Sequence, residues 1–72
     1  MSISVSEGAV LARAARVAID RRADYPLAAR LLVELRHLHH ELGLDFTSGF
    51  ERFTASYGHS EELMRALRRV GL

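Results

Sequence analysis

The chain of 72 residues contains no cysteine, so neither a disulfide nor a thiolate metal site stabilises its fold. It also lacks lysine, tryptophan, asparagine and glutamine, and it has a single proline. All 10 basic residues are therefore arginine, and the net charge of +1 argues against a dedicated nucleic-acid binder. A chain of this length buries only about 60% of its unfolded surface. Residues 1–72 are thus expected to form one small domain, stabilised by apolar packing or by a partner.

The apolar runs are too short for a membrane span, which needs about 18 or more consecutive apolar residues. The first eight residues, MSISVSEG, have neither the basic start nor the apolar centre of a secretion signal. The sequence therefore predicts a cytoplasmic protein that makes no membrane contact.

An alanine-rich segment predicts a first helix over about residues 6–22. Ser4 and Glu7 have the spacing of a capping box, in which each side chain bonds to a free N–H at the helix start. The small side chains that follow would let a second helix approach closely.

The second predicted helix, residues 26–42, has the clearest pattern. Asp24 is a candidate N-cap, Pro26 suits the first turn, and Gly43 stands where a left-handed residue ends many helices. The short connection makes the first two helices antiparallel neighbours, a helical hairpin. Apolar residues at alternating spacings of three and four form a stripe that faces the core. This stripe contains Ala28, Leu31, Leu35, Leu38 and Leu42.

A third helix is expected to start near residue 49, after a connection over residues 44–48. Ser48 and Glu51 have the spacing of a second capping box. Aromatic residues recur at helical spacing and are predicted to pack on the second helix. They are Phe46, Phe50, Phe53 and Tyr57.

The chain beyond Tyr57 admits two alternatives. In one, a single long helix covers about residues 49–70 and accommodates Gly58 at a cost of about 1 kcal/mol. In the other, the helix breaks near Gly58 and Ser60 caps a fourth helix. The apolar phase of the third helix continues through Met64 and Leu67, which favours the long helix. Either alternative gives an all-α fold, a small bundle of three or four helices.

Three histidines and a glutamate lie within the segment RHLHHELG, residues 36–43. On a helix, His37, His40 and Glu41 share one surface, while His39 lies at the flank of the apolar stripe. A stable metal site needs three or four protein ligands, and nothing places His59 near this surface. The sequence therefore predicts neither a metal site nor a cofactor.

Catalytic constellations are also missing from the sequence. The serines and threonines cluster at predicted helix starts, where capping explains them, and the glycines occur singly rather than in a phosphate-binding loop. We therefore expect a non-enzymatic protein.

The side of the second helix opposite its leucine stripe is the predicted contact surface. Val33 is apolar there and Ala29 is small, which indicates a helix that is covered on two sides. The alternative is a single exposed valine of no functional consequence. We predict a protein–protein interaction module, a small adaptor or regulator that binds another protein or a second copy of itself. The interface would contain Ala29, Arg30, Val33, Arg36, His37 and His40.

A second hypothesis is a small nucleic-acid-associated regulator. It requires the first and last helices to adjoin, so that their arginines form one phosphate-binding patch. The arginines concerned are Arg13, Arg16, Arg21 and Arg22 on the first helix, and Arg65, Arg68 and Arg69 near the C-terminus.

Several segments together resemble the C-terminal helical-repeat region of bacterial SWIM zinc-finger proteins. They are YPLAARLLVELRHLHHELG (residues 25–43), then Phe50 and Phe53, and the ending LMRALRRVGL (residues 63–72). The resemblance covers about residues 17–72 and implies a tetratricopeptide-like piece of a helical scaffold that binds proteins. It implies no zinc ligand, because the chain has no cysteine.

Overall fold

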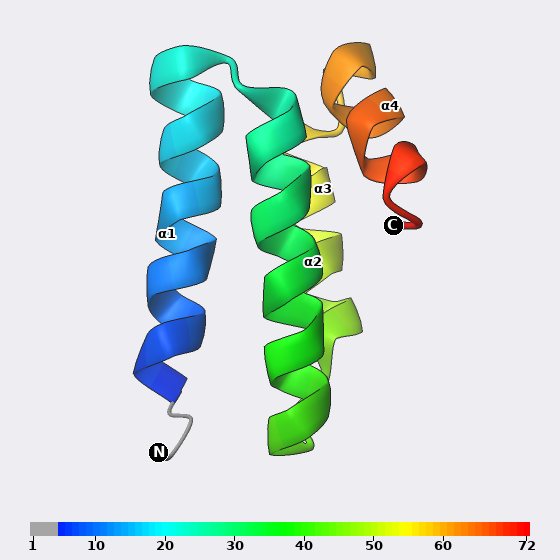
Figure 1. Cartoon of the computed structure of the whole chain (residues 1–72). Helices are drawn as coiled ribbons and strands as arrows, with labels where there is room; N and C mark the ends of the chain where they lie inside the picture. The colour runs from blue at the N-terminus through cyan, green and yellow to red at the C-terminus, as the bar shows by residue number, and fades with distance from the viewer. Residues whose placement is uncertain (1–4) are drawn as a thin grey trace.

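The computed structural model describes residues 5–72, which form four α-helices. Helices α1 (Val5–Arg22) and α2 (Tyr25–Leu42) lie side by side as a hairpin, α3 (Phe46–Tyr57) lies behind α2, and α4 (Glu61–Arg69) flanks α2 on the side away from α1 (Figure 1). The predicted all-α bundle is confirmed. Within this described part of the chain, no helix is long and apolar enough to cross a membrane.

The hairpin of α1 and α2 begins and ends within one residue of the predicted bounds. Asp24 is the N-cap of α2, and its Oδ1 accepts a hydrogen bond from the Leu27 N–H at 3.2 Å. Gly43 ends the helix with φ 69°, and the Leu44 N–H donates to the His39 carbonyl at 2.8 Å. This left-handed cap satisfies carbonyls that the helix end leaves free. The predicted capping box at the start of α1 involves Ser4, which lies outside the described residues.

Helix α3 starts at Phe46, earlier than predicted, because its N-cap is Asp45. The Asp45 carboxylate accepts hydrogen bonds from the Thr47 N–H at 3.0 Å and from the Ser48 hydroxyl at 2.7 Å. These bonds, the Ser48 bond first, hold the pKa of Asp45 below its usual 3.8. The capping box predicted for Ser48 and Glu51 is therefore wrong. Ser48 supports the cap instead of forming it.

The favoured single helix over residues 49–70 is also wrong, and the alternative with a break is correct. Helix α3 ends at Tyr57, and Ser60 caps α4 by accepting a hydrogen bond from the Leu63 N–H at 3.4 Å. At Gly58, an added Cβ would collide with the Thr54 carbonyl oxygen. Glycine is therefore needed at this position, because there is no room for a side chain. The break frees α4 to pack on a different side of α2.

We expect Gly58→Ala to lower the free energy of unfolding by about 1–3 kcal/mol, because the new methyl group meets a backbone atom that cannot move away. Gly49→Ala is the matched control within α3. Nothing lies within 4 Å of its added Cβ, so helix propensity should raise stability by about 0.5–1 kcal/mol. Urea denaturation measures both changes. If Gly58→Ala and Gly49→Ala changed the free energy of unfolding in the same direction, this would contradict the helix break at Gly58.

Helix α2 is the centre of the fold and packs against α1, α3 and α4. Leu63 and Leu67 of α4 are the largest fully buried side chains. Because α4 covers the side of α2 opposite its predicted stripe, the core includes both sides of that helix. The buried core residues are Ala15, Ala18, Ala28, Ala29, Leu32, Leu35, Phe53, Leu63 and Leu67.

Candidate functional site

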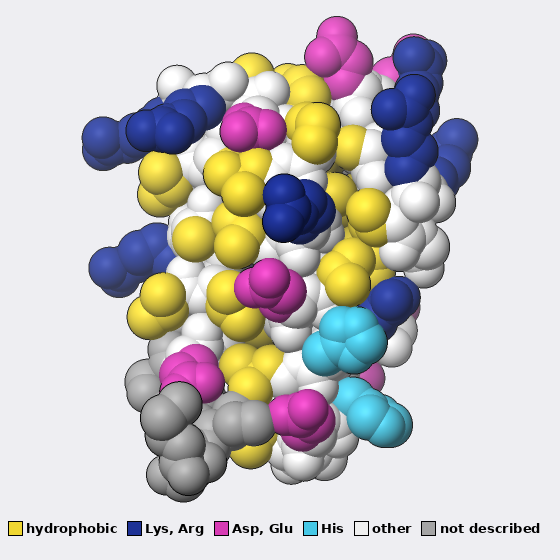
Figure 2. Space-filling view, viewed as in Figure 1, with side chains coloured by type: hydrophobic (Ala, Val, Ile, Leu, Met, Phe, Trp, Pro, Cys, Tyr) yellow, Lys and Arg dark blue, Asp and Glu magenta, His cyan; other side chains and the backbone are white. Residues whose placement is uncertain are grey.

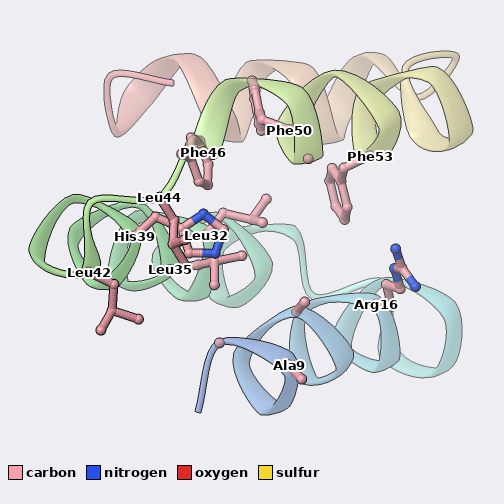
Figure 3. Close-up of a pocket in the computed structure, with 13 residues that line it drawn as sticks. Ala9, Arg16, Leu32, Leu35, His39, Leu42, Leu44, Phe46, Phe50 and Phe53 are labelled. Atoms are coloured by element: carbon pink, nitrogen blue, oxygen red, sulfur yellow. The ribbon is translucent and has the colours of Figure 1, made fainter. Parts of the chain in front are cut away.

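A groove of about 300 Å³ runs between α1 and α3, with α2 as its floor. Figure 3 shows phenylalanine side chains of α3 above this space, α1 below it, and residues of α2 between them. Apolar side chains and glycines make up almost the whole lining. The lining residues are Gly8, Ala9, Ala12 and Arg16 of α1; Leu32, Leu35, His39 and Leu42 of α2; and Leu44, Phe46, Gly49, Phe50 and Phe53.

The wall formed by α3 is aromatic. The Phe46 and Phe50 rings stack with centroids 5.3 Å apart, and the Phe53 and Tyr57 rings are tilted at 4.8 Å. Phe53 is buried, whereas Phe46 and Phe50 are only half-buried. The aromatic stripe predicted from the sequence therefore packs on α2 at one edge and lines the groove at the other.

The wall formed by α1 is made of small residues. Gly8 is buried, and a Cβ added there would lie 3.4 Å from Leu35 Cδ1 and 3.5 Å from Leu38 Cδ2. Helix α1 therefore lies close to α2. Ala9 and Ala12 continue this wall. Their short side chains leave the groove wide along α1.

A hydrogen bond links α1 and α3 beyond one end of the groove. The Tyr57 hydroxyl donates to Asp20 Oδ2 at 3.2 Å. Burial, and then the hydrogen bond and charge of Asp20, raise the pKa of Tyr57 above its usual 10.0, while the charge of Arg16 opposes this shift. The link fixes the distance between the two walls at this end.

His39 brings a polar group to the groove. Its ring lies edge-on to Phe46, with centroids 5.8 Å apart and an interplanar angle of 69°. Its Nδ1 is buried and has no hydrogen-bond partner among the residues that the structure describes. The prediction of His39 at the flank of the apolar stripe agrees with this half-buried position.

The predicted interface on α2 is partly covered by the chain's own C-terminus. Ala29 is 1% exposed and belongs to the core, so it is not available to a partner in this fold. Val33 is half-buried and shares a shallow depression with Val70. Arg36 Nη1 donates to the Gly71 carbonyl at 3.2 Å. The other predicted interface residues are exposed and remain a predicted surface: Arg30, His37 and His40.

The arginines of the first and last helices do not form one patch. Helices α1 and α4 lie on opposite sides of α2 (Figure 1). On the face shown in Figure 2, basic side chains lie at the two opposite edges, over α1 and over α4, with one more between them over α2. The geometry required by the nucleic-acid hypothesis is therefore not present.

The histidine surface brings no further ligand with it. Among residues 5–72, no group of three or more His, Cys, Asp or Glu side chains converges as a metal site would require. The groove is a candidate site that the sequence did not lead us to predict. The aromatic spacing of α3 was its one signal in the sequence.

A scan against protein-family models finds no match, and searches of characterised proteins and of solved structures find no similar chain.

Proposed function

We propose that the chain is a non-enzymatic helical module of the cytoplasm that acts through protein–protein contact by associating with itself, with the groove as its contact surface. The observation that carries this proposal is the unfilled side of the bundle between α1 and α3. Three helices, α1, α2 and α3, surround this position. In four-helix bundles, and in complexes that bind a helix in a groove, one more apolar helix fills such a position. Half-buried Phe46 and Phe50 would become buried by such a helix.

The chemistry of the lining supports a protein partner. Among the described residues that line the groove, only Arg16 and His39 carry hydrogen-bonding side chains, so most of the contact is apolar. Apolar contact across a wide groove suits the side chains of a helix. It also agrees with the resemblance to helical-repeat proteins, in which each repeat buries an apolar face against its neighbour.

The experiment is sedimentation equilibrium of the chain and of two charge variants of α3. Gly49→Glu should abolish self-association, because it places a carboxylate in the apolar groove at a position with free space around the Cβ. Ala55→Glu is the control, since Ala55 is exposed and lies on the side of α3 opposite the phenylalanines. It should associate like the unchanged chain.

Two results would contradict the proposal. One is a chain that stays monomeric at every concentration. The other is association that survives Gly49→Glu but is lost in Val33→Glu, which would place the contact on the Val33 side of α2 instead.

A further inference from the structure

Three large hydrophobic residues are exposed in the described chain, and the groove explains only one of them. Leu44 is 45% exposed and lines the groove. Val10 and Val17 are 66% and 43% exposed, and they lie seven residues apart on one face of α1. That face points largely away from the core, because the buried Ala15 is on the opposite side of the helix, and its edge at Val10 borders a shallow depression shared with Glu34 of α2.

The two unexplained apolar surfaces complement each other. The groove lacks a helix, and the outer face of α1 lacks a cover. Both walls allow a close approach: Ala9 and Ala12 are small, and Gly49 has nothing within 4 Å of an added Cβ. An apolar face of a helix would therefore reach the floor of the groove.

We propose, on the basis of the proposed function, that the groove is filled by helix α1 of a second copy of this chain. The exchange is reciprocal, so that α1 of each copy lies between its own α2 and the other copy's α3. A two-fold axis parallel to the helices produces this arrangement, since α1, α2 and α3 run roughly parallel or antiparallel (Figure 1). A two-fold axis perpendicular to the helices is excluded, because it would place α2 of one copy in the space that α3 of the other copy occupies.

The arrangement aligns specific residues. The Tyr57–Asp20 hydrogen bond places Tyr57 of α3 at the same height along the bundle as Asp20 of α1, and both helices run in the same direction. Counting back from this bond places Gly49 level with Ala12, about 3 Å along the axis from Val10. Val10 of the partner subunit would thus lie beside Gly49 and the stacked phenylalanines.

The required interface is feasible for a chain of this size. A stable dimer buries about 800 Å² per partner, roughly one-sixth of the 5195 Å² that this chain exposes.

Cysteine cross-linking tests the arrangement directly, because the chain has no cysteine of its own. The Val10→Cys and Gly49→Cys chains are mixed and oxidised, and the disulfide-linked peptides are identified by mass spectrometry. A cross-link between the two variants is expected. Val10→Cys mixed with Ala55→Cys is the control and should give none, since Ala55 lies on the far side of α3. Val17→Glu should weaken dimerisation about tenfold or more while the fold is unchanged.

The outcomes separate this inference from the proposed function. If the chain associates and Gly49→Glu abolishes association, but Val10→Cys and Gly49→Cys do not cross-link, another surface fills the groove and this inference is wrong. If the chain does not associate at all, both proposals are wrong. An unchanged dimerisation constant in Val17→Glu also overturns the role of the outer face of α1.

Discussion

Leu63→Ala should lower the free energy of unfolding by about 2–5 kcal/mol. Leu63 is 0% exposed, and with Leu67 it anchors α4 on α2. A chain of 72 residues has a total stability of about 4–11 kcal/mol. The substitution therefore removes a large part of the stability, because it leaves a cavity under a helix of only nine residues.

Equilibrium denaturation in urea, followed by circular dichroism, measures this effect. Met64→Ala is the matched control, since Met64 is adjacent but only half-buried, and it should cost clearly less. The comparison also tests the break at Gly58. A continuous helix in the phase of α3 would bury Met64 in place of Leu63, so a larger effect at Met64 would contradict the structure.

The sequence contained enough information to predict α1 and α2, but not how the chain continues after α3. Capping residues and a regular leucine stripe placed the hairpin within one residue. The break was missed because apolar residues occur in adjacent pairs, Leu63 with Met64 and Ala66 with Leu67. Two helical phases fit such pairs equally well. The local signals, Gly58 and Ser60, were correct and the phase argument was not.

The location of α4 explains what covers Ala29 on the side of α2 where the interface was predicted. The apolar character of Ala29 and Val33 did indicate a second covered side of α2. The cover is α4 of the same chain, which the predicted long helix could not have supplied. The groove depends on the distance between α1 and α3, two helices that are not consecutive. No local pattern in the sequence encodes that distance.

Phe53→Ala should lower the free energy of unfolding by about 3–5 kcal/mol. Phe53 is 6% exposed and is the one buried residue of α3, so it holds this helix on the core. Its ring also packs against Tyr57 at 4.8 Å, a contact worth about 0.5–1.5 kcal/mol beyond its buried area. Phe50→Ala is the matched control. It should cost less, because Phe50 is only half-buried.

The pKa of Tyr57 gives a second readout of the same substitution. Burial is the first cause that raises this pKa above 10.0, and the hydrogen bond to Asp20 is the next. Removing the Phe53 ring admits water beside Tyr57, so its pKa should fall towards 10.0.

A raised pKa of Tyr57 in the folded state favours the neutral phenol, so this contribution to stability is complete below pH 10.0 and is lost as the pH rises through the folded pKa. Ultraviolet titration in a Tyr25→Phe background follows Tyr57 alone. An equal loss of stability in Phe50→Ala and Phe53→Ala, with no change in the Tyr57 pKa, would mean that α3 presents a different face to α2 and that the groove has a different wall.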